Sequence, residues 1–373
     1  MDQQKKRIPI LFCTGHTGGH LFPAQSCAEA FLREKDEAEV HILLNRRPSY
    51  IDIEMAQKDA RIRYHVIPFP APPQVASFKF PLFLIEFIFV LWRTLLLFFQ
   101  IKPQLVIGFG SFASVSGVLI ARVLGIPILL HEQNVAAGRA NRFLSHLADR
   151  VAISFPETIF KLPTHRVFLS GFPLRESLWE AVQSEPSREF EGCFGVLIFG
   201  GSQGALRLNE AVLESMGLLP AEERKFFAVT HIVGNNDVVR YQAQYRKLGI
   251  VSRVIQYTDQ IGHYLKGSDL VISRSGAGTI FELAAFKRAA ILIPYPHAYG
   301  HQKLNAAYLV SRRCARMIEE HDLTADSLLT VLHELSGNRE ERMRLGSNIH
   351  ALWLADSTKR IVSQGWELRC RKN

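Results

Sequence analysis

The sequence predicts an α/β protein built from two Rossmann-like domains, and three observations support this prediction. The chain has 373 residues, more than one ordinary hydrophobic core holds. Short apolar runs alternate with segments of helical period along most of its length. Several of these runs end in a glycine-rich turn that opens a helix, which is typical of parallel sheets with crossover helices.

The first domain is predicted to begin with a strand at residues 8–13. The loop Thr14-Gly15-His16-Thr17-Gly18-Gly19-His20 follows this strand, and a helix is predicted over residues 21–34. Further strands are expected at residues 40–44, 63–67, 105–107 and 127–130. A second glycine loop, Gly108-Phe109-Gly110-Ser111, leads into a helix that ends near Leu124.

The second half repeats this pattern, with strands expected at residues 195–199, 227–233, 253–255, 270–273 and 289–293. Its two glycine loops are Gly200-Gly201-Ser202-Gln203-Gly204 and Arg274-Ser275-Gly276-Ala277-Gly278-Thr279. We therefore expect an N-terminal domain at residues 1–165 and a C-terminal domain at 166–345. A helical tail at 346–373 is expected to pack back on the first domain.

The composition excludes several classes of function. The five cysteines form no CxxC pair, so zinc ribbons and redox dithiols lack support, and no Asp-x-Asp or histidine cluster suggests a metal. We expect neither metal nor cofactor. The net charge is +9, but the basic residues are dispersed and no nucleic-acid motif occurs. No signal peptide is recognisable at the N-terminus, which favours a cytoplasmic protein.

The segment of residues 78–101 departs from this regular pattern because it is almost entirely apolar. Its length suits a membrane span, but Glu86 and Arg93 within it are costly at a bilayer centre. Three structures stay open: a helix buried against the sheet, a helix with one side resting on a membrane, and a span. Lys79, Arg93 and Lys102 suit contact with anionic lipid in the second case.

The glycine loops are the candidate chemical sites. Backbone N–H groups at a glycine turn and helix N-terminus bind a diphosphate. In parallel sheets such turns share the carboxyl edge, so we expect all four loops to open toward one interdomain cleft.

Polar residues at the ends of the predicted strands add candidate contacts to these loops. His20 is a candidate proton acceptor, and His131-Glu132-Gln133-Asn134 suits hydrogen bonding to sugars and phosphates. Glu282 is a candidate ligand of a ribose. The run from His297 to Asn305 is expected to face the same pocket.

Taken in order, five motifs resemble one family. They are Thr17-Gly18-Gly19-His20; His131-Glu132-Gln133-Asn134; Gly200-Gly201-Ser202-Gln203-Gly204-Ala205; Ser275-Gly276-Ala277 with Thr279 and Glu282; and His301-Gln302 with Asn305-Ala306. This set resembles the MurG family, the peptidoglycan N-acetylglucosaminyltransferases of glycosyltransferase family 28, which convert lipid I to lipid II. The resemblance covers about residues 8–310.

The resemblance implies a GT-B fold and an inverting, metal-free transfer of N-acetylglucosamine from UDP-N-acetylglucosamine to the C4 hydroxyl of lipid I. It implies a peripheral enzyme on the cytoplasmic face of the inner membrane, with other cell-wall synthesis proteins as partners. His20 is the expected base and Glu132 the alternative. The implied donor contacts are Thr17, Gly18, Gly19, Asn134, Arg175, Ser202, Thr258, Ala277, Gly278, Thr279, Ile280, Phe281, Glu282, His301 and Gln302.

The chain departs from the family pattern at His16, Gly278, Phe281 and His301, where glycine, leucine, serine and glutamine are more usual. Two other enzyme classes stay open. A UDP-N-acetylglucosamine 2-epimerase shares the architecture and the nucleotide but has no use for an exposed apolar helix. A diacylglycerol glycosyltransferase shares the membrane-facing domain and differs in its acceptor. A nucleotide-binding module without chemistry is disfavoured by the polar residues at the loop ends.

Overall fold

The computed structural model divides the chain into two compact units. It describes residues 7–45, 60–69, 73, 78–185, 189–201, 205–297 and 300–371. Unit 1 comprises Met1–Arg175 and Leu354–Asn373, and unit 2 comprises Glu176–Trp353. The chain therefore crosses between the units twice, after Arg175 and after Trp353, whereas the sequence suggested boundaries after residues 165 and 345.

Unit 1 is built on a parallel sheet of seven described strands in the order β3-β2-β1-β4-β5-β6-β7. Its strands are β1 (Ile8–Thr14), β2 (Ala38–Leu44), β3 (Ile62–Val66), β4 (Leu105–Gly108), β5 (Ile128–Glu132), β6 (Arg150–Ile153) and β7 (Val167–Leu169). Its helices are α1 (Gly18–Glu34), α3 (Phe80–Ile101), α4 (Ala113–Val123), α5 (Arg139–Leu144), the short 3-10 helix η1 (Thr164–Arg166) and α15 (Ser357–Arg371).

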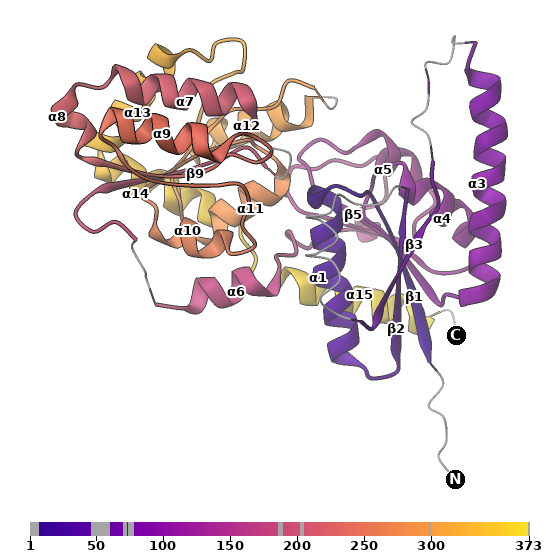
Figure 1. Cartoon of the computed structure of the whole chain (residues 1–373). Coiled ribbons are helices and arrows are strands. Elements are labelled where there is room, and N and C mark those ends of the chain that lie inside the picture. The colour runs from indigo at the N-terminus through magenta and orange to yellow at the C-terminus, as the bar shows by residue number, and fades with distance from the viewer. Residues whose placement is uncertain are drawn as a thin grey trace. The chain divides into compact units, whose positions relative to one another are not determined.

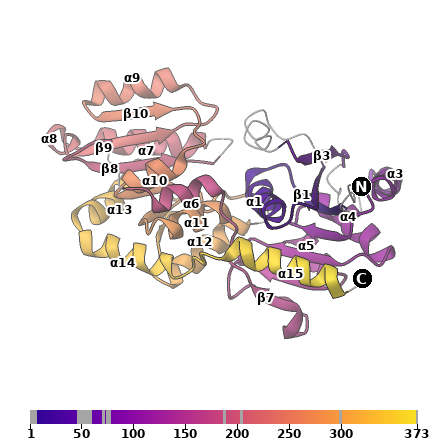
Figure 2. The ribbon, with the colours of Figure 1, turned by 90° about the horizontal axis from the view of Figure 1, so that it is seen from below.

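Helices cover both faces of this sheet (Figure 1). On one face α15 packs beside α1, where Trp366 lies 5.0 Å from the Phe31 ring and Lys35 lies 4.3 Å from Trp366. Figure 2 shows α15, in yellow, running along unit 1 toward the C-terminus. The C-terminal helix is therefore part of the core of the first unit.

On the other face α4 packs against the sheet and α3 packs on α4. Only one stripe of α3 is buried, formed by Phe83, Val90, Thr94, Leu97, Phe98 and Ile101. Among the described residues α3 is the one helix long and apolar enough to cross a membrane. Only 28% of its most apolar 18-residue stretch is buried inside the structure. Of the three structures left open for this segment, the helix buried against the sheet does not fit, because most of the apolar surface of α3 is exposed.

Unit 2 is built on a parallel sheet of six described strands in the order β10-β9-β8-β11-β12-β13. Its strands are β8 (Phe194–Phe199), β9 (Phe227–Ile232), β10 (Val251–Ile255), β11 (Leu270–Ser273), β12 (Ala290–Leu292) and β13 (Arg316–Met317). Its helices are α6 (Glu176–Gln183), α7 (Leu206–Leu218), α8 (Ala221–Arg224), α9 (Val238–Leu248), α10 (Ile261–Gly267), α11 (Ala277–Ala285), α12 (His301–Ser311), α13 (Ala325–Gly337) and α14 (Arg339–His350).

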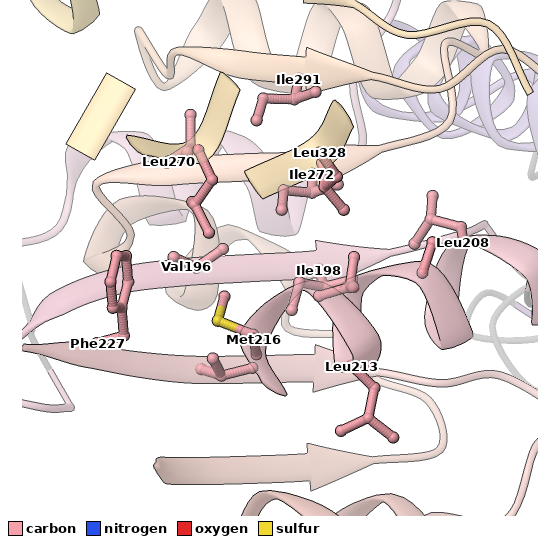
Figure 3. Close-up of a cluster of buried hydrophobic side chains, with 14 of the residues drawn as sticks. Val196, Ile198, Leu208, Leu213, Met216, Phe227, Leu270, Ile272, Ile291 and Leu328 are labelled. Carbon is pink, nitrogen blue, oxygen red and sulfur yellow. The ribbon is translucent and has the colours of Figure 1, made fainter. Parts of the chain in front are cut away.

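The core of unit 2 forms where branched side chains from its strands meet α7 and α13 (Figure 3). Val196 and Ile198 are two residues apart on β8, so both side chains point to this side of the sheet. Met216 of α7 and Leu328 of α13 pack in the same core cluster. The prediction of two Rossmann-like domains with parallel sheets is confirmed, and both sheets have the strand order of a nucleotide-binding fold.

Candidate functional site

Each sheet has a topological switch point, where successive crossovers leave toward opposite faces. In unit 1 this point lies between β1 and β4, because α1 and α4 cover opposite faces. In unit 2, β8 and β11 are the corresponding pair. Ligands of open α/β sheets bind at the carboxyl ends of such strands, and the glycine loops of each unit lie there.

The first loop of unit 1 brings a helix N-terminus to this edge. Thr17 is the extended N-cap residue of α1, and its carbonyl accepts hydrogen bonds from the backbone N–H groups of His20 and Leu21. A Cβ added to Gly18 would lie 2.7 Å from the Phe22 ring, whereas a Cβ added to Gly19 would meet nothing within 4 Å. The loop therefore presents open backbone at Gly19, which suits the approach of an anion to the helix N-terminus.

The His20 side chain points back to the second glycine loop. Its Nδ1 lies 2.8 Å from the carbonyl oxygen of Phe109. Because a carbonyl only accepts hydrogen bonds, Nδ1 must carry the proton, and in the neutral ring the lone pair is then on Nε2. The structure thus orients Nε2 as the atom of His20 that can take a proton.

Glu132 ends β5 and is 1% exposed. Its Oε1 accepts hydrogen bonds from the backbone N and the side-chain Nδ2 of Asn134, at 3.0 and 3.2 Å. Its Oε2 accepts from the Gly138 backbone at 3.0 Å and from Asn141 Nδ2 at 2.9 Å. Four N–H groups therefore surround the carboxylate, an arrangement that folds the following segment around it and suits positioning better than proton abstraction.

His131 precedes Glu132 and is fully buried. Burial lowers the pKa of its imidazole to about 4, so the ring is neutral near pH 7. Its Nε2 donates to the Gly171 carbonyl at 3.2 Å, which leaves Nδ1 as an acceptor for Gln133 Nε2 at 3.1 Å. His131 thus adds no positive charge near His20.

Two further predicted contacts lie at the same edge of unit 1. The Arg175 guanidinium lies 4.7 Å from the centre of the Phe22 ring on α1, close to the first glycine loop. Asn134 is held by Glu132, and its carbonyl accepts a hydrogen bond from Thr158. In unit 1, Arg175 thus packs on α1, and Asn134 is fixed beside Glu132 at the carboxyl end of β5.

In unit 2 the loop after β8 is shaped by two glycines. A Cβ at Gly200 would lie 2.4 Å from the Ala205 side chain, so only glycine allows this close turn. Gly201 has a φ of +88°, in the left-handed region that favours glycine. The predicted contact Ser202 lies outside the described residues.

Helix α11 starts after the extended N-cap Gly276 and carries six of the fifteen predicted donor contacts. The side chains of Ala277, Ile280 and Phe281 are buried in unit 2, so a ligand could reach only their backbone. The remaining three, Gly278, Thr279 and Glu282, are partly exposed and share one side of the helix.

The start of α12 is tied to the loop that precedes α11. Gln302 Oε1 accepts a hydrogen bond from the Tyr295 backbone at 3.0 Å, and the Gln302 carbonyl accepts one from Ser275 Oγ at 2.8 Å. Its neighbour His301 is partly exposed, and its buried Nδ1 has no hydrogen-bond partner among the described residues. Thr258 follows the edge strand β10, and its hydroxyl accepts a hydrogen bond from the Gln260 backbone N–H.

One polar chain in unit 2 was missed by the sequence analysis. The buried His231 of β9 accepts a hydrogen bond from the Tyr245 hydroxyl at 2.9 Å and donates to Asn209 Oδ1 at 3.2 Å. Asn209 in turn donates to the Val233 carbonyl at 3.1 Å. This chain holds the first turn of α7 against β9, and a histidine inside an apolar strand run was the signal for it.

Because His231 is buried as a neutral ring within these hydrogen bonds, we expect the protein to lose stability in acid. Burial lowers the pKa of His231 to about 3, below the ordinary value of 6.5. The stability due to the neutral ring is therefore complete above pH 6.5 and is lost as the pH falls toward 3. One such group contributes a slope of up to about 1.4 kcal/mol per pH unit.

Urea unfolding of the parent and of His231→Gln, followed from about pH 7 to about pH 4, measures this slope. We expect a flatter pH dependence in the variant, whereas replacement of the exposed His165 by glutamine retains the parent slope. Equal slopes in the parent and His231→Gln would contradict the assignment.

Comparison with known proteins places this geometry in a family. Residues 10–153 match the glycosyltransferase family 28 N-terminal domain, and residues 195–361 match the C-terminal domain of the same family. A relative from Citrifermentans bemidjiense is 32% identical over 355 residues, covering 95% of this chain and 98% of its own length. One from Geobacter metallireducens is 32% identical over 357 residues, covering 95% of this chain and 97% of its own. Both are named UDP-N-acetylglucosamine–N-acetylmuramyl-(pentapeptide) pyrophosphoryl-undecaprenol N-acetylglucosamine transferase.

Two solved structures resemble this chain over nearly its whole length. The crystal structure of Acinetobacter baumannii MurG matches with a TM-score of 0.75 and 25% identity, over 97% of this chain and 99% of that one. A UDP-N-acetylglucosamine 2-epimerase from Listeria monocytogenes matches with a TM-score of 0.68 and 12% identity, over 96% and 95% of the two chains. The second likeness extends to the fold alone.

Proposed function

Because the chain belongs to the MurG family of N-acetylglucosamine transferases, built from the two domains of glycosyltransferase family 28, we propose that it performs their reaction. The enzyme is a hexosyltransferase that moves N-acetylglucosamine from UDP-N-acetylglucosamine to lipid I and forms lipid II. The acceptor is N-acetylmuramoyl-pentapeptide linked through a diphosphate to undecaprenol.

The reaction is a single displacement with inversion. The C4 hydroxyl of the acceptor attacks the anomeric carbon of the donor, and the bond from that carbon to the UDP oxygen breaks. His20 Nε2 takes the hydroxyl proton, and UDP leaves with the bonding electrons. The observation that carries this assignment is the 2.8 Å hydrogen bond from His20 Nδ1 to the Phe109 carbonyl, which fixes the tautomer that a base requires.

The two units divide the binding work. Unit 1 holds the acceptor, and its N-terminal turn of α1 and Arg175 also contact the donor. The partly exposed face of α11 holds the donor nucleotide, with Glu282 on the ribose hydroxyls and Gln302 on the sugar. The glycine loop after β8, including Ser202, stabilises the charge that develops on the departing diphosphate.

The direct test is incubation of the purified protein with labelled UDP-N-acetylglucosamine and lipid I in detergent. Label should appear in lipid II, with release of one UDP per sugar transferred. Conversion of the donor to its 2-epimer without an acceptor would indicate an isomerase instead. Labelling of diacylglycerol in preference to lipid I would assign a different acceptor.

We further propose that α3 rests on the cytoplasmic face of the inner membrane, where the undecaprenyl acceptor resides and other cell-wall synthesis proteins meet the enzyme. Its exposed side carries large apolar residues: Leu82, Leu84, Ile85, Ile88, Phe89, Trp92, Leu96 and Phe99. Such a continuous apolar strip is unusual on a soluble surface. Lys79 and Arg93 accompany it and suit anionic headgroups.

Charge on this strip is expected to release the protein from lipid. The double variant Ile85→Glu/Ile88→Glu should lower binding to phosphatidylglycerol vesicles at least about tenfold, because two exposed isoleucines lose their apolar contact. Co-sedimentation measures the bound fraction. The matched control is Val239→Glu on α9, an exposed apolar residue of unit 2, which should bind as the parent does. Unchanged binding of the double variant would argue against α3 as the docking surface.

A further inference from the structure

Gln133 lies in the turn after β5 and is 1% exposed. Its amide nitrogen lies 3.0 Å from the Phe109 carbonyl oxygen, 3.2 Å from the His131 carbonyl oxygen and 3.1 Å from His131 Nδ1. All three neighbours are acceptors, since His131 Nε2 donates to Gly171. The nitrogen of the amide, and not its oxygen, must therefore face them.

This orientation costs stability. The amide oxygen of Gln133 is buried and has no hydrogen-bond partner in the described part of the chain. A buried acceptor without a donor destabilises a fold. The Gln133 side chain therefore serves the hydrogen bonds that its amide nitrogen donates. The acceptor that lies outside its own turn is the Phe109 carbonyl oxygen.

The Phe109 carbonyl is shared between Gln133 and His20. Its oxygen accepts from His20 Nδ1 at 2.8 Å and from Gln133 Nε2 at 3.0 Å, so both of its lone pairs are used. The backbone after it is held in the left-handed region at Gly110 and Ser111, with φ of +75° and +63°. The direction of this carbonyl is therefore set from both sides.

We propose that Gln133 is a positioning residue for His20, acting through the shared Phe109 carbonyl to hold the ring and its tautomer in the orientation that accepts the proton of the sugar hydroxyl. The proposal rests on His20 as the base of the proposed transfer. Without Gln133 the carbonyl keeps a single donor, His20 Nδ1, so the peptide and the ring bonded to it can swing together away from the sugar hydroxyl. The carbonyl also becomes a stronger acceptor for the protonated ring.

The test is Gln133→Met, which keeps the length of the side chain and removes the donor. We expect kcat to fall about tenfold with the donor KM little changed. The acidic limb of the pH profile of kcat should move to higher pH by about half a unit. The matched control is Gln25→Met on α1, a buried glutamine of unit 1 that donates to the Tyr64 hydroxyl, and it should keep the parent profile. An unmoved limb in Gln133→Met would overturn the proposal.

The double variant His20→Ala/Gln133→Met separates positioning from a general structural effect. If Gln133 acts through His20, the double variant is as slow as His20→Ala alone. Multiplied losses of rate would contradict the proposal. If His20→Ala itself turns over normally, the assignment of the base has failed, an outcome distinct from the failure of Gln133 alone.

Gln133→Glu provides a second variant if Gln133→Met does not fold. Its carboxyl keeps the shape and one donor when protonated, and loses that donor when ionised. Its kcat relative to the parent should therefore fall as the pH rises. A ratio that does not change with pH would count against the shared-carbonyl role.

Discussion

Replacing His20 by alanine is expected to lower kcat by about 10²- to 10⁴-fold, the usual contribution of a positioned general base. The fold should persist, because the His20 side chain is partly exposed and the Phe109 carbonyl still accepts a hydrogen bond from Gln133. The acceptor hydroxyl then has to lose its proton to water, while donor and acceptor contacts elsewhere remain. Steady-state transfer of labelled sugar to lipid I, with both substrates varied, measures the change.

The matched control is His146→Ala, which removes an exposed histidine of the same unit beyond α5. It should transfer sugar at the parent rate. Thermal unfolding of both variants checks that the loss is chemical. Near-normal turnover by His20→Ala would remove it as the base. Glu132 would not automatically replace it, since its carboxylate already accepts four hydrogen bonds.

The second large effect is expected from Glu282→Ala, which should raise the donor KM by about 10- to 100-fold with a smaller change in kcat. A hydrogen bond from a ligand to a charged group contributes roughly 1.5–3 kcal/mol, which corresponds to this range. Glu282 lies on the partly exposed side of α11, beside Gly278 and Thr279. The contact is made in ground and transition states alike, so its loss affects binding more than turnover.

Calorimetric titration with UDP distinguishes a ribose contact from a sugar contact. Weaker binding of UDP itself, by a similar factor, is the expected result. Glu214→Ala on α7 is the control, a carboxylate of unit 2 on an exposed turn away from α11. A donor KM equal to that of the parent would show that Glu282 does not hold the nucleotide.

Local sequence features were sufficient for the fold class. Alternating apolar runs and helical periods predicted the longer strands and helices, and the glycine turns marked the carboxyl ends of β1, β4, β8 and β11. The short strands β6, β7 and β13 were not predicted. A run of two to four residues, partly buried in β7 and β13, carries too little periodicity to be distinguished from a loop.

The motifs named the candidate residues, but they did not show how the fold arranges those side chains. Glu132 was the alternative base by sequence, and the structure surrounds its carboxylate with N–H donors from Asn134, Gly138 and Asn141. Ile280 and Phe281 were expected donor contacts, and their side chains are buried. The direction of a side chain depends on its packing partners, which a motif does not record.

By itself, the amino-acid sequence determined two parallel-sheet domains, their glycine loops and the order of the polar motifs, because these depend on neighbouring residues along the chain. Only the tertiary structure decided that α3 exposes most of its apolar surface and that His20 and Gln133 share the Phe109 carbonyl. The two donors of that carbonyl come from α1 and from the turn after β5, far apart in sequence. Such contacts exist only once the sheet has brought those segments together.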